Sequence, residues 1–130
     1  MKRAKFLVIV GGMSLLLAEA GSATAAAASL RVRCEVRSNR SKISVDLKRA
    51  VKGSVVTAVV TNTDGFSVQA IAAQTVVRKQ AEFDFDSDDD DVLAGATEIP
   101  SNFIDRNNPH VTARISKLNL QTTVTCKVKK

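Results

Sequence analysis

The sequence predicts an all-β fold: a single immunoglobulin-like β-sandwich of about seven antiparallel strands with one disulfide, over residues 29–130. Three observations predict it. Apolar and polar residues alternate with period two through most of this stretch, as they do in half-buried strands. Turn residues recur at intervals of about 8 to 12 positions, which is typical of a sandwich. The only two cysteines, Cys34 and Cys126, fall on the apolar faces of the first and last strands.

The elements of the N-terminal half follow from this alternation. Residues 30–37 alternate Leu, Val, Cys and Val with charged side chains, and residues 42–48 alternate in the same way. Residues 55–61 are rich in β-branched side chains, which favours a central strand. The sequence Asn-Thr-Asp-Gly at 62–65 predicts a hairpin, because glycine readily takes a positive φ. Residues 66–73 are expected to form the next strand, although their alanines suit a helix equally well.

The C-terminal half continues the pattern. Residues 82–86 read Glu-Phe-Asp-Phe-Asp, which puts both Phe rings on one face and the acids on the other. Residues 87–95 are expected to form an acidic loop. Residues 97–104 are expected to include one helical turn, since Pro100 suits a first helical position. Residues 111–118 and 121–128 alternate again and complete the sandwich.

Residues 1–28 have the layout of a secretory signal peptide. Lys2, Arg3 and Lys5 are followed by an apolar run over 6–18 and by small residues over 21–28. The apolar run is short of the roughly 20 residues that span a bilayer, so an uncleaved anchor is the weaker alternative. We expect cleavage near residues 25–28, no transmembrane segment in residues 29–130, and a periplasmic or secreted location.

In an exported chain, an isolated pair of cysteines is most simply a disulfide. A Cys34–Cys126 crosslink would close a loop of nearly the whole domain, for which loop entropy gives roughly 4 to 5 kcal/mol as an upper figure. Free thiols and a metal site are the alternatives. The lone His110 cannot complete a two-cysteine metal site.

The acidic segment 84–91 is the first candidate site. Asp84, Asp86 and Asp88 match the first three ligand positions of a calcium loop. The match then fails, because Asp89 stands where glycine is needed and Gly95 where glutamate is needed. The alternatives are a solvated charge run, a partner for the basic strands, or a looser calcium site. Such a calcium site would use Asp86, Asp88, Asp89 and Asp91. No other cofactor is expected.

A positive patch is the second candidate site, formed if the disulfide brings the end strands together. It would consist of Arg31, Arg33, Arg37, Lys127 and Lys129. Such a patch suits a protein or an anionic envelope component. Nucleic acid is not expected as a partner, because no aromatic residues are interleaved for base stacking. The alternative is a charged edge that prevents edge-to-edge aggregation.

Enzymatic activity is not expected. His110 is the only histidine, and no nucleophile motif accompanies it. A small hydrolase that uses His110 is therefore the weakest alternative. We expect a non-enzymatic exported module that binds a macromolecular or envelope partner, with a calcium-dependent binding domain as the main alternative.

Four segments carry a resemblance to known proteins. They are Arg31–Glu35, Arg40–Asp46, Glu82–Ser87 and Ala94–Thr97. At these segments the chain resembles small exported bacterial proteins of uncharacterised function. The resemblance implies a periplasmic or secreted single domain whose final strand carries the second cysteine. It implies no activity and no site residues.

Overall fold

The computed structural model describes residues 27–130, so all but the last two residues of the predicted signal peptide lie outside the described part. Most of the described chain is in strands, with one short helix. The elements in chain order are β2 (Ser29–Arg37), β3 (Arg40–Lys48), β4 (Val55–Val56), β5 (Ala58–Asn62), β6 (Ser67–Gln69), β7 (Gln74–Thr75), β8 (Gln80–Asp86), α2 (Asp89–Leu93), β9 (Thr97–Glu98), β10 (His110–Ile115), β11 (Leu120–Thr125) and β12 (Lys127–Val128). Within residues 27–130, no helix is long and apolar enough to cross a membrane.

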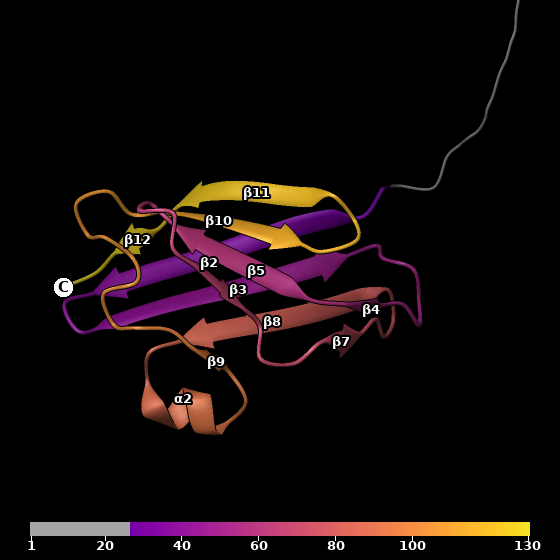
Figure 1. Ribbon diagram of the computed structural model, residues 1–130, viewed down its shortest axis with the longest axis horizontal. Helices are drawn as coiled ribbons and strands as arrows, with labels where there is room; N and C mark the ends of the chain where they lie inside the picture. The colour runs from indigo at the N-terminus through magenta and orange to yellow at the C-terminus, as the bar shows by residue number, and fades with distance from the viewer. Residues whose placement is uncertain (1–26) are drawn as a thin grey trace, which may run out of the picture.

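The strands form two main sheets and a small third one (Figure 1). One main sheet has the order β12-β2-β3-β8-β9 and the other β11-β10-β5-β6, while β4 pairs with β7 alone. The expectation of antiparallel pairing throughout is wrong at the two edges of the five-stranded sheet. There β12 runs parallel to β2, and β9 runs parallel to β8. Each parallel strand has two residues and pairs near the C-terminal end of its neighbour, with Glu35 and Val36 of β2 or with Phe85 and Asp86 of β8.

The two main sheets share one hydrophobic core, which confirms the predicted alternation. The core residues of β3 and β8 are Ile43, Val45, Leu47, Ala81, Phe83 and Phe85. The opposite sheet contributes Ala58, Val60, Val111, Ala113 and Ile115. Apart from Ala81, each of these side chains is at most 3% exposed. The outward residues of the same strands are left to form a polar surface.

Three of the predicted strands are interrupted or shortened. The stretch expected as one strand at 121–128 breaks at Cys126, so that β11 and β12 belong to different sheets. The stretch expected as one strand at 55–61 breaks at Thr57, so that β4 and β5 belong to different sheets. The strand expected at 66–73 is only three residues long, and its alanines form neither helix nor strand. The hairpin between β5 and β6 is confirmed. Gly65 has a φ of +86°, and Asn62 Oδ1 accepts hydrogen bonds from the N–H groups of Asp64 and Phe66.

The helical turn expected within 97–104 is wrong, because that stretch begins as β9 and continues in turns without α-helix. The helix lies instead in the expected acidic loop. Asp88 caps it by accepting a hydrogen bond from the N–H of Asp90 at 2.9 Å. Asp89, Asp90 and Asp91 occupy its first turn, where the helix dipole favours negative charge.

The predicted disulfide is present. The sulfurs of Cys34 and Cys126 are bonded, with their Cα atoms 4.8 Å apart and 92 residues of separation along the chain. Cys126 lies directly between β11 and β12. The crosslink therefore anchors the C-terminal segment to β2, beside which β12 then pairs.

Candidate binding groove

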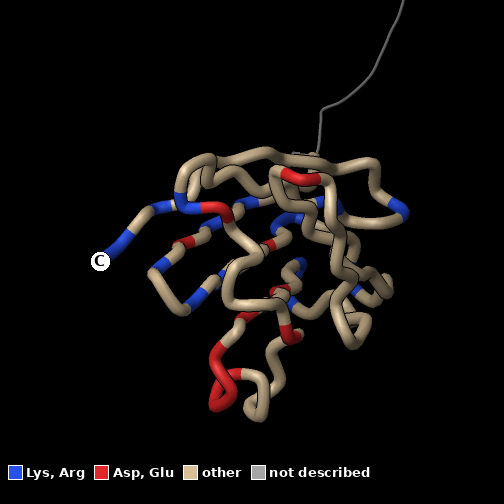
Figure 2. The backbone as a smooth tube through the Cα atoms, turned by 60° about the vertical axis from the view of Figure 1, so that its left-hand side comes forward, with Lys and Arg blue, Asp and Glu red and all other residues tan. Residues whose placement is uncertain are grey.

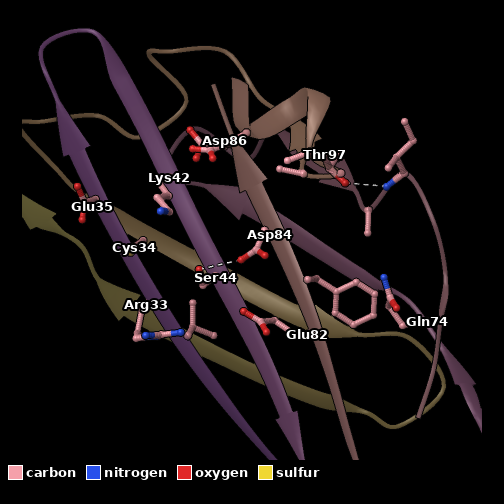
Figure 3. Close-up of a pocket in the computed structure, with 18 of the residues that line it drawn as sticks. Arg33, Cys34, Glu35, Lys42, Ser44, Gln74, Glu82, Asp84, Asp86 and Thr97 are labelled. Atoms are coloured by element: carbon pink, nitrogen blue, oxygen red, sulfur yellow. Dashed lines mark hydrogen bonds between the residues drawn. The ribbon is translucent and has the colours of Figure 1, made fainter. Parts of the chain in front are cut away.

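A groove of about 1000 Å³ lies across the outer face of β2, β3 and β8. Its floor consists of outward-facing side chains of these strands, several of which are labelled in Figure 3. One wall is formed by residues 70–74 and 94–97, beyond β8. At the opposite side, Thr125 and Lys127 border it next to β2. The groove is therefore supported by rigid strands on its floor and by loops at its wall.

Strand register arranges the charges of the outer face of β2, β3 and β8, which carries the groove. Cross-strand partners lie in three rows, which read Arg31–Asp46–Glu82, Arg33–Ser44–Asp84 and Glu35–Lys42–Asp86 from β2 through β3 to β8. The β2 side is mainly basic and the β8 side is wholly acidic. This polarity follows from the period-two pattern, because the same alternation that buries the core turns every second residue outward.

Some of these charges are satisfied within the groove and others are not. Arg33 Nη2 lies 3.2 Å from Asp46 Oδ2. Ser44 Oγ donates to Asp84 Oδ1 at 3.0 Å, as Figure 3 shows. Among residues 27–130 no ion pair involves Glu82. The negative charge of Asp84, partial burial and the charge of Asp46 all raise the pKa of Glu82. The β8 side of the groove thus holds excess negative charge that a cation would relieve.

Arg40 neutralises the acids at the end of β8. The Asp86 side chain is only 2% exposed, and its two carboxylate oxygens accept hydrogen bonds from Arg40 Nε at 3.0 Å and Nη2 at 2.8 Å. The N–H of Asp88 also donates to it at 3.0 Å. Burial raises the pKa of Asp86, but the hydrogen bonds from Arg40 and Asp88 outweigh burial and leave it below the ordinary value. The guanidinium also contacts the carboxylate of Asp91.

The structure brings three of the four proposed calcium ligands together, around this guanidinium. Asp88 Oδ2 lies 3.9 Å from Arg40 Nη1, while Asp89 is exposed on α2 and takes no part. Arg40 thus supplies the positive charge that the acidic run requires. In the described range 27–130, no group of three or more His, Cys, Asp or Glu side chains is arranged to hold a metal ion. Sequence reasoning identified the acids but missed Arg40, which lies 46 residues before Asp86.

The proposed basic patch is brought together only in part. The pairing of β12 with β2 does place Lys127 opposite Glu35. However, the carboxylate of Glu35 interrupts the positive surface. Its Oε1 lies 3.5 Å from Lys129 Nζ, and its Oε2 lies 3.4 Å from Arg37 Nε. Burial raises the pKa of Glu35, but these two cations outweigh burial and lower it overall. Blue and red segments accordingly alternate along the strands in Figure 2, while red segments gather around α2.

The wall beyond β8 was not predicted as part of a site. Thr97, which is 8% exposed, accepts a hydrogen bond at Oγ1 from the N–H of Ile71 at 2.8 Å, and this bond ties the two wall segments together (Figure 3). No alternation or motif in residues 70–74 signals this role. His110 is exposed at the start of β10, with Nδ1 2.7 Å from Asn108 Oδ1, and does not border the groove.

No family model, curated protein or solved structure matches this chain. Its function is therefore inferred from the groove and its charges.

Proposed function

We propose that this protein is an exported, non-enzymatic binding module that holds a protein partner in the groove across β2, β3 and β8. The observation that carries the proposal is the charge polarity of the groove, in which the acids of β8 exceed their ion-pair partners. Fixed charges on rigid strands favour complementary partners and reject those of like charge. A partner that presents basic residues would relieve the repulsion between Glu82 and Asp84.

We further infer that the scaffold is an immunoglobulin-like sandwich. The support is the order of the seven strands that have three or more residues among those described. β2, β3 and β8 lie together in one sheet, and β11, β10, β5 and β6 lie in the other. Named A, B, C, C′, E, F and G in chain order, these strands give the groups A-B-E and G-F-C-C′, which is the partition of immunoglobulin domains.

Export rests on two features. Residues 1–28 are the proposed signal peptide, and Cys34 and Cys126 form a disulfide, which persists mainly in oxidising compartments. A periplasmic or secreted location is accordingly part of the proposal. Expression in a bacterial host with sequencing of the mature N-terminus tests this point. A start near residues 26–29 is expected, whereas an intact Met1 would contradict it.

Cross-linking capture from envelope extracts tests the binding role. The groove variants are Arg33→Glu and the pair Glu82→Lys with Asp84→Lys. The control variants are Arg114→Glu and Asp64→Lys, which reverse exposed charges outside the groove. We expect the double variant Glu82→Lys with Asp84→Lys to capture at least ten-fold less partner protein than the wild type. The control variants should capture as much as the wild type. Equal capture by all variants with unchanged melting temperatures would show that the groove is not the recognition surface.

A further inference from the structure

One edge of β8 is unpaired along part of its length. On the side away from β3, Gln80 exchanges two main-chain hydrogen bonds of 3.0 Å with Val77, and the carbonyl of Asp86 accepts from the N–H of Ile99 at 3.1 Å. Alternate residues of a strand direct their main-chain groups to the same side. Those of Glu82 and Asp84 therefore point to this edge as well. The parallel register of Phe85 with Thr97 pairs the carbonyl of Asp84 with the N–H of Thr97 in β9. Among the described residues, no strand pairs with the N–H and C=O of Glu82 or with the N–H of Asp84.

The chain leaves space beside this edge. After the Val77–Gln80 turn, the preceding residues do not continue alongside β8, because β7 pairs with β4 instead. A second hollow of about 440 Å³ lies here, lined by Gln74, Thr75 and Val77, by residues 80–82 of β8, and by Arg33 and residues 46–48 of β2 and β3. It adjoins the main groove, because Arg33, Gln74 and Glu82 line both hollows. In Figure 3, Gln74 lies across from the labelled Glu82 and Asp84.

The two sides of this edge differ in chemistry. On the outer side stand the exposed carboxylates of Glu82 and Asp84, with Asp46 behind them. Towards the core, the groove is lined by Phe83, Ala70 and other small apolar residues. An added strand alternates its side chains between these two surroundings. It would therefore place basic residues on one face and small apolar residues on the other.

We propose that β8 receives an extended segment of a basic protein partner as an added strand beside Glu82 and Asp84. The main chain of the segment pairs with the free N–H and C=O groups of Glu82 and with the free N–H of Asp84. Its Lys or Arg side chains lie next to their carboxylates, and its alternate apolar side chains face Phe83. Strand addition to an open edge is an established mode of peptide recognition. This inference rests on the proposed function and specifies how the partner is held.

The length of the open edge limits the contact. Three residues, Glu82 to Asp84, span about 10 Å in a strand. Exposed apolar side chains stand on segments bordering the groove, with Ile71 79% and Leu93 86% exposed, and extend the surface available to a partner. A short main-chain pairing supported by charge predicts binding that weakens as salt is added.

Amide hydrogen exchange measured by NMR with model peptides tests the proposal on the whole domain. The probe is a seven-residue peptide that alternates lysine and valine. Its controls are the same peptide with N-methylated central amides and a peptide with glutamate in place of lysine. We expect the alternating peptide to slow exchange at Glu82 and Asp84 by at least ten-fold. The methylated peptide should bind at least ten-fold more weakly, and the acidic peptide should not bind.

The outcomes separate this inference from the proposed function. If the methylated peptide binds as tightly as the parent, or if exchange at Glu82 and Asp84 stays fast, strand addition is wrong while charge-based capture in the groove can still hold. Protection of the same amides by protein concentration alone, without peptide, would overturn the choice of partner in favour of a second copy of this chain. Glu82→Gln should weaken the peptide at least three-fold, whereas Asp64→Asn should not change its affinity.

Discussion

Replacing Arg40 with methionine would leave the carboxylate of Asp86 buried without its counter-ion. Asp86 is 2% exposed and would lose hydrogen bonds of 3.0 and 2.8 Å, keeping only the one from the N–H of Asp88. Breaking a buried ion pair by removing one partner costs about 3 to 5 kcal/mol, because the remaining charge is uncompensated. A domain of this size has an unfolding free energy of about 5 to 15 kcal/mol, so this loss is a large share.

Urea denaturation and thermal melting, followed by circular dichroism, measure the loss. We expect the Arg40→Met variant to melt on the order of 15 °C or more below the wild type at neutral pH. The matched control is Arg33→Met, which breaks the pair with Asp46 at 3.2 Å. The Arg33 side chain is 57% exposed, so the control should lose less than about 1 kcal/mol.

The effect should depend on pH in a defined direction. In the wild type, the pKa of Asp86 is below its ordinary value, so its stabilising contribution is present above that value and disappears as pH falls through the folded-state pKa. Without Arg40, burial should raise the pKa of Asp86, and a protonated Asp86 needs no counter-ion. The difference in stability between wild type and Arg40→Met should therefore begin to narrow above the ordinary Asp pKa of about 3.9 and should narrow further as pH falls towards 3.

Two results would refute this reasoning. One is that Arg40→Met loses no more unfolding free energy at pH 7 than Arg33→Met does. The other is an equal loss at pH 3 and pH 7, which would indicate lost packing rather than an unpaired charge. The double variant Arg40→Met with Asp86→Leu supplies a further check. It should recover most of the stability, because it removes both charges and leaves none unpaired.

Three other predictions follow from the same structure. Replacing Cys34 and Cys126 with serine should lower the unfolding free energy by up to about 4 to 5 kcal/mol in urea titrations, and a loss below 1 kcal/mol would contradict the loop-entropy argument. Ser41→Ala should lower the unfolding free energy by about 1 to 3 kcal/mol, because the fully buried Ser41 Oγ donates to one main-chain carbonyl and accepts from one main-chain N–H. Ser44→Ala is the near-neutral control, because the hydrogen bond of Ser44 is exposed. The melting temperature in millimolar calcium should exceed that in chelator by less than about ten degrees, because Arg40 already pairs with Asp86 and Asp91. A larger rise would indicate a calcium-binding domain.

The sequence alone determined the parts of the fold that depend on local periodicity. Alternation at 30–37, 42–48 and 82–86 identifies three strands and the face that each buries, because neighbouring side chains of a strand point to opposite sides of a sheet. The same phase placed Cys34 and Cys126 on inward faces, and their disulfide follows. It also identified the outward charges of the groove, although not their order across it.

Tertiary structure decided which distant residues meet. Arg40 reaches Asp86 across 46 positions, and nothing near either residue signals the pair. That pairing, together with the Asp88 cap, allows the acidic run to fold as α2 instead of remaining an extended loop. The departure of β7 towards β4, which leaves the β8 edge open, likewise depends on competition between distant strands. Such choices follow from packing and long-range pairing, which a period-two pattern does not encode.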